Sequence, residues 1–134
     1  AGYLLLHLMP SYRPAVLAEI LRVLRPMGLA VFGEVDMRIV MRRWLSDPTT
    51  PASSDLIWGE LGKVHGIGMA EWDTHHHGYC EETLCSALAE AGFVNMIRVS
   101  IHSSEVYYEL TIACQKPADG FLEGPSEGLG ASQA

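Results

Sequence analysis

The fold of this chain is decided by residues 14–36, which read PAVLAEILRVLRPMGLAVFGEVD. The apolar residues that share one helical face in this stretch are Val16, Leu17, Ile20, Leu21 and Leu24. Pro26 cannot continue that helix, and Gly28 is expected to adopt the positive φ that reverses the chain. The apolar run from Leu29 to Val35 is typical of a strand covered on both faces in a parallel sheet. A helix, a turn and a buried strand predict half of a βαβ unit.

Length and composition bound the rest of the chain. Its 134 residues, 49% of them hydrophobic, predict one packed domain. The net charge of −7 argues against nucleic acid as a partner, since phosphate binding needs a basic surface. Three cysteines without a CxxC pair predict neither a disulfide framework nor structural zinc, so a cytoplasmic protein with reduced thiols is expected. No apolar run approaches the ~18 residues of a membrane span, so no membrane partner is expected.

The remaining segments predict further helices and strands by their periodicity. A buried strand is expected to end within residues 1–9, and Ser11 is a plausible N-cap for the helix that follows. Further elements are predicted at residues 37–45 (helix), 80–92 (helix), 95–101 (strand) and 106–115 (strand). The predicted fold class is α/β, with a mostly parallel sheet and a terminal antiparallel hairpin. Residues 117–134, rich in Gly, Pro, Ser and Ala, are predicted to be a disordered tail.

Three stretches in this order resemble the C-terminal half of the class I S-adenosylmethionine-dependent methyltransferases, of the methyltransferase type 11-like kind. LLLHL (residues 4–8) with VLAEILRVLRPMGLAVF (16–32) looks like the stretch from the end of that family's fourth strand to its fifth. HGYCEETLCSALAEAGF (77–93) looks like its later helix, and ELTIACQKP (109–117) looks like its last strand. The resemblance implies a partial Rossmann-like domain over residues 1–116 that transfers a methyl group from S-adenosylmethionine to a small-molecule acceptor.

The departures from the family pattern are informative. Leu6 stands where the family usually has Glu, and Met27 where it usually has Gly. No G-x-G lies between a strand and a helix, so the Gly-rich loop that holds the donor has no counterpart here. The chain is therefore expected to be a fragment that is inactive alone. The alternative is a non-catalytic half-domain that associates through an exposed edge strand at residues 1–8.

Candidate site residues lie where strands end, because ligands of open α/β sheets bind beyond the carboxyl ends of the strands. The resemblance implies that Ala1, Gly2, Tyr3 and His7 approach the methionine part of the donor. For His7, a histidine bonded to backbone at a helix start is the structural alternative. Glu34 and Asp36 follow the second strand; Glu34 is a candidate base and Asp36 a candidate substrate ligand, unless both simply cap the next helix.

Residues 55–78 are predicted to form an irregular insertion, which in a compact domain is often a lid or a binding loop. The run from Asp73 to His77 invites a metal interpretation, but consecutive histidines point in different directions, so no metal site is predicted. The resemblance instead implies that His75 faces the acceptor pocket as a binder or base, with a surface loop as the alternative. Three aromatic residues are candidates for lining that pocket: Trp58, Trp72 and Tyr79. A small satellite core is the alternative role for the two tryptophans.

Overall fold

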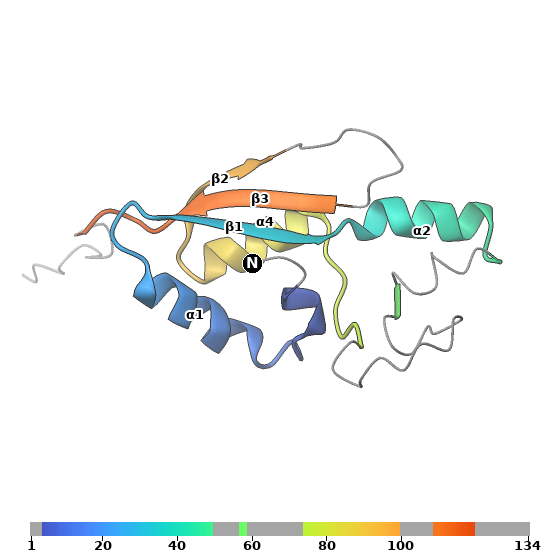
Figure 1. Ribbon diagram of the computed structural model, residues 1–134, viewed down its shortest axis with the longest axis horizontal. Coiled ribbons are helices and arrows are strands. Elements are labelled where there is room, and N and C mark those ends of the chain that lie inside the picture. Colours follow the sequence, from blue (N-terminus) through green and yellow to red (C-terminus); the bar gives the residue numbers. More distant parts are fainter. Residues whose placement is uncertain (1–3, 50–56, 59–73, 100–108, 120–134) are drawn as a thin grey trace, which may run out of the picture.

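The computed structural model describes residues 4–49, 57–58, 74–99 and 109–119. Predictions for other residues, including Ala1, Gly2, Tyr3, Trp72 and the tail from residue 120, lie outside this part. In chain order the elements are η1 (Leu5–His7), α1 (Arg13–Val23), β1 (Leu29–Val35), α2 (Met37–Ser46), α4 (Glu81–Glu90), β2 (Val94–Arg98) and β3 (Glu109–Gln115) (Figure 1).

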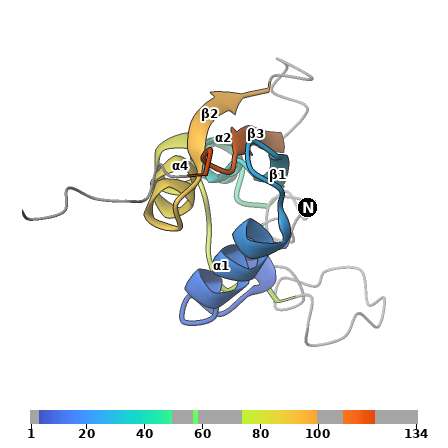
Figure 2. The ribbon, with the colours of Figure 1, turned by 90° about the vertical axis from the view of Figure 1, so that its left-hand side faces the viewer.

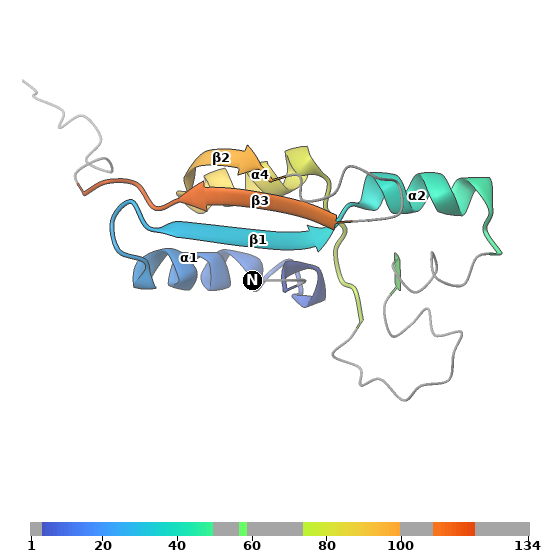
Figure 3. The same cartoon turned by 45° about the horizontal axis from the view of Figure 1, so that its top comes forward.

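The described strands form a three-stranded sheet in the order β1-β3-β2, and both pairings are antiparallel (Figure 3). The prediction of a mostly parallel sheet is therefore wrong; only the antiparallel pairing of β2 with β3 agrees with it. β1 and β2 do run in the same direction, but β3 lies between them and pairs with both. The apolar run of β1 indicates burial, and burial does not fix the direction of the neighbouring strand.

Helices cover one face of the sheet, and apolar residues on part of the other face are exposed. Phe32 of β1 pairs with Ile112 of β3, and both are buried in the core. The helices α1 and α4 lie on the same side of the sheet (Figure 2). The residues in register on the opposite face are Val31, Ala113 and Ile97, one from each strand. Val31 is 49% exposed and Ile97 is 65% exposed, so this part of the face is open, whereas Val35 and Thr111 on the same face are buried.

In the turn that follows α1, the residue with the positive φ is not the one that was predicted. Met27, not Gly28, has a positive φ, of 60°. Gly28 is required for a different reason: a Cβ there would lie 2.7 Å from the carbonyl oxygen of Arg25, which accepts a hydrogen bond from the Gly28 N–H. At the end of α4, predicted as a helix over residues 80–92, a glycine stops the helix. Gly92 has a φ of 101°, and its N–H and that of Phe93 close the last turn as in a Schellman motif.

The first described element is a short helix, so the strand expected to end within residues 1–9 does not extend into residues 5–7. Leu5–His7 is a 3-10 helix, and Leu5 and Leu6 are buried in the core. The edge strand predicted at residues 1–8 is therefore wrong for this part. Ser11 is not the N-cap of the next helix either; Tyr12 takes that position without a side-chain hydrogen bond. An apolar run predicts that a segment is buried, but a short one does not distinguish a strand from a helical turn.

Candidate functional site

The candidate site lies beyond the carboxyl end of β1, where η1 and residues 74–80 meet the sheet. At its base is Glu34, whose side chain is fully buried. Its Oε1 accepts a hydrogen bond from the Leu5 N–H (2.9 Å) and its Oε2 one from the Leu6 N–H (3.2 Å). Burial raises the pKa of Glu34, and the backbone hydrogen bonds partly oppose that increase. Its carboxylate therefore faces the backbone of η1, not solvent.

The histidine segment is attached to the other side of η1. The carbonyl oxygen of Leu6 accepts hydrogen bonds from the backbone N–H groups of His76 (2.7 Å) and His77 (3.3 Å). The N–H of His75 donates to the carbonyl oxygen of Trp58 at 3.3 Å. These bonds hold residues 75–77 against a helix that is about 70 residues earlier in the chain.

The two histidines that were predicted to take part in the site are brought together. The rings of His7 and His75 meet edge to face, with centroids 4.8 Å apart, and both side chains are half-buried. Nδ1 of His7 lies 3.4 Å from the carbonyl oxygen of Thr74. A contact between His7 and backbone, the structural alternative, is thus present together with a contact between the two rings. A histidine ring in this position can bind a ligand or accept a proton.

Tyr79 belongs to the core of the site. It is only 2% exposed, and Nη1 of Arg13 donates to its hydroxyl oxygen at 3.3 Å. The ring of His77 packs edge to face on the Tyr79 ring at 4.7 Å. Burial raises the pKa of Tyr79 and, with the nearby Arg13 charge, lowers that of His77. Arg13 was missed in the sequence, because nothing in α1 indicates a contact with a residue 66 positions away.

Asp36 has a structural role. Its Oδ1 accepts from the N–H of Arg38 at 3.1 Å, which makes it the N-cap of α2. Its Oδ2 pairs with Nη2 of Arg98 at 3.1 Å, and Nη1 of Arg98 bonds Glu81 at 2.8 Å. A backbone hydrogen bond also joins the start of α2 to the segment that follows the histidines, since the Met37 N–H donates to the Tyr79 carbonyl oxygen. The capping alternative is confirmed for Asp36, whose carboxylate is already occupied by protein groups.

The other predicted site residues are not brought to this cluster. Trp58 is 52% exposed and reaches the site only through its backbone carbonyl. Ala1, Gly2, Tyr3 and Trp72 lie outside the described residues. Within the described ranges, no three His, Cys, Asp or Glu side chains are grouped so that they could hold a metal ion.

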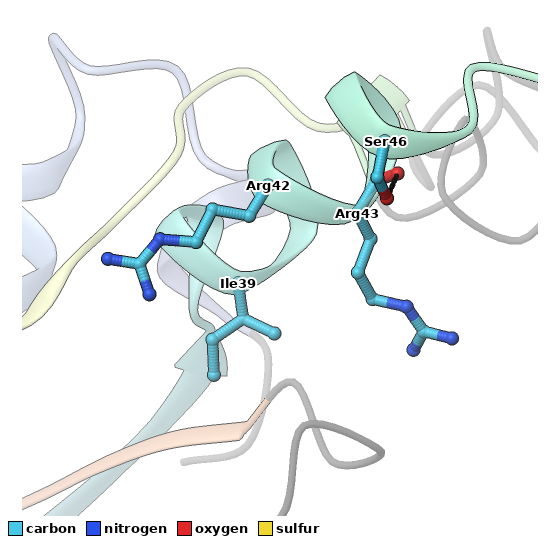
Figure 4. Close-up of a pocket in the computed structure, with 4 residues that line it drawn as sticks. All are labelled: Ile39, Arg42, Arg43 and Ser46. Atoms are coloured by element: carbon cyan, nitrogen blue, oxygen red, sulfur yellow. Dashed lines mark hydrogen bonds between the residues drawn. The ribbon is translucent and has the colours of Figure 1, made fainter.

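The arginine cluster of α2 does not form a convergent anion site. Arg42 and Arg43 line a 240 Å³ cavity with Ile39 and Ser46, but their guanidinium groups point away from one another (Figure 4). Arg38, also on α2, pairs with Glu82 at 2.8 Å. A solvated helix face accounts for this cluster.

No protein-family model, curated protein or solved structure matches the chain. None of the helices in the described ranges is long and apolar enough to cross a bilayer.

Proposed function

We propose that this chain is the acceptor-side part of an S-adenosylmethionine-dependent methyltransferase that acts on a small molecule. One observation carries the proposal: residues within the stretches that resemble the family, or a few positions beyond them, meet at one place. Glu34 binds the backbone of Leu5 and Leu6, and Asp36 forms a bridge with Tyr79. Segments far apart in the sequence thus form one cluster at the end of a strand, where α/β proteins bind ligands.

Methyl transfer is an in-line displacement in which an acceptor lone pair forms a bond to the methyl carbon while the carbon–sulfur bond breaks. The sulfonium sulfur becomes a neutral thioether, and most of the catalysis comes from alignment of donor and acceptor. A base is needed only where the acceptor loses a proton. In the proposal His75 binds the acceptor or takes that proton, because it is half-buried and its ring is held against His7. Glu34 is too deeply buried to act as that base.

The described residues fit only the methionine part of the methyl donor. Its ribose hydroxyls call for a carboxylate that can still accept hydrogen bonds. The two acids nearest the histidine cluster, Glu34 and Asp36, already bind backbone N–H groups and, for Asp36, Arg98. His7, with Ala1, Gly2 and Tyr3 by resemblance, remains on the methionine side. We therefore propose a donor site that these 134 residues leave incomplete, in a cytoplasmic enzyme with no membrane or nucleic-acid partner.

The first test is calorimetric titration of S-adenosylmethionine into the 134-residue chain. We expect no binding at micromolar concentration, because the Gly-rich loop that would hold the donor is not in this sequence. Tight binding would overturn the incomplete-site proposal. The coding sequence upstream is then decisive: a strand followed by a Gly-rich loop supports the enzyme, and its absence contradicts it.

In the longer protein, His75→Ala is expected to lower the methyl-transfer rate by roughly 10²-fold or more for an acceptor that must lose a proton. His76→Ala is the matched control, because His76 is the exposed neighbour in the same run. Transfer of labelled methyl groups measures both variants. Equal losses in the two would remove His75 from the proposed site.

A second candidate is a non-catalytic module that associates with a second copy of itself. The observation that favours it is the open sheet face, where Val31, Ala113 and Ile97 align as an uncharged row across three strands. Exposed apolar patches of this kind often mark association surfaces.

A further inference from the structure

We propose that Glu34 is a positioning residue, whose buried carboxyl group holds η1 so that His7 rests against His75. The importance of this arrangement for methyl transfer rests on the proposed function. The positioning itself rests only on contacts within the structure.

The contacts form one continuous path from the sheet to the two rings. Glu34, in β1, binds the N–H groups of Leu5 and Leu6, which are 29 and 28 residues earlier in the chain. Leu6 is held from both sides, since its carbonyl oxygen accepts the N–H groups of His76 and His77. His7 is the last residue of η1, so the position of its ring depends on how this helix is held.

Stability alone does not explain a carboxyl group at this position. Glu34 is fully buried, and no described Arg, Lys or His side chain forms an ion pair with it. Removing a carboxylate from water is costly, and two backbone donors offset only part of that cost. Residues that break the rules of core packing are concentrated at functional sites.

The ionisable groups around Glu34 come from three other segments. Tyr79 lies close enough for the Glu34 charge to raise its pKa. Arg13, from α1, donates to the Tyr79 hydroxyl, and His77 packs on the Tyr79 ring. His7 is carried by η1 itself. Any of these could respond to a change at Glu34, so the test must distinguish His7 and His75 from the others.

The test is Glu34→Gln, with Asp36→Asn as the matched control. Asp36 is another buried acid two residues further on, but it caps α2 and pairs with Arg98. In E34Q we expect the ring resonances of His7 and His75 to move. The amide protons of Leu5 and Leu6 should also exchange roughly ten-fold faster or more, because a hydrogen bond to a charged acceptor is lost. D36N should leave all four signals in place. Unchanged signals in E34Q, or equal changes in D36N, would overturn the proposal.

A titration of the unmodified chain supplies a test that does not depend on a variant. The carboxyl carbon of Glu34 and the rings of His7 and His75 are followed by nuclear magnetic resonance as pH changes. We expect the ring signals of both histidines to show an inflection at the midpoint of Glu34. Histidine curves without that inflection would overturn the proposal. If the coupling is found but the longer protein transfers no methyl group, the proposed function fails and the positioning role of Glu34 stands.

Discussion

At the scale of single residues, the buried carboxyl group of Glu34 has a thermodynamic consequence. Burial is the main influence on its pKa and raises it above the ordinary value of 4.5. An acid whose pKa is raised by folding binds its proton more tightly in the folded protein. Its contribution to stability is therefore fully present below the pKa of the unfolded chain and is lost as pH rises through the folded value.

The corresponding prediction compares the free energies of unfolding of the wild type and Glu34→Gln as pH changes. Above pH 4.5, the wild type should lose stability relative to E34Q, by at most about 1.4 kcal/mol per pH unit, until Glu34 is ionised in the folded protein. Urea denaturation between about pH 4 and about pH 8 measures the difference, in which other titrating groups cancel. Parallel curves would contradict a raised pKa for Glu34.

Sequence reasoning at this scale succeeded where the cause was local. The capping role of Asp36 depends on a residue two positions away, and capping was one of the alternatives that the sequence offered. The partners of Glu34 are 28 and 29 residues away, and no local pattern indicates them. The turn after α1 was predicted only in part. The sequence correctly indicated that Gly28 matters, but the reason is close packing against Arg25, and the residue with the positive φ is Met27.

At the scale of elements, Asp36 joins the ends of three of them. It caps α2, and through Arg98 at the end of β2 it is connected to Glu81 in the first turn of α4. This network fixes α2 at a point where the helix leaves the sheet and extends beyond it (Figures 1 and 3).

We expect Asp36→Ala to destabilise the protein by about 2 kcal/mol, because it removes an N-cap and one partner of a partly buried ion pair. Denaturant unfolding measures the change. Glu19→Ala is the matched control, since Glu19 also pairs with an arginine, Arg22, but on the exposed surface of α1. Its effect should be much smaller. Similar losses in the two variants would mean that Asp36 does not connect these elements.

The helices were easier to predict than the sheet. α1 and α4 follow from apolar spacing and from Pro and Gly at their ends, all within a few residues. The direction of strand pairing depends on which strands become neighbours, and β3 is about 80 residues beyond β1. The same limit affected the site: His75 and His7 were both singled out, but only the fold shows that their rings touch.

At the scale of the whole molecule, the most unusual feature is the group of apolar side chains exposed on one face of the sheet. Helices cover one face, while Leu29, Val31, Ile97 and Val99 remain partly or largely exposed on the other. Exposed apolar area of this kind favours association, whichever function the chain has.

The prediction is that the double variant Val31→Thr, Ile97→Thr weakens self-association by about ten-fold, since less apolar area would be removed from water. Threonine keeps the branched shape that strands prefer. Val23→Thr is the control, because Val23 is 64% exposed but lies on α1. Sedimentation velocity over a concentration series measures all three proteins. A wild type that stays monomeric at high concentration would contradict the association candidate.

The place of β3 in the sheet also has a consequence for synthesis on the ribosome. Among the described strands β3 is the last to be made, yet it is the one that pairs with both others. At about 5–20 residues per second, β1 waits several seconds after it emerges before its partner exists. Until then β1 and β2 lack the neighbour that they share, and the backbone groups that later pair with β3 can pair with other chains. Synthesis of β3 is therefore the step that joins β1 and β2 into one sheet.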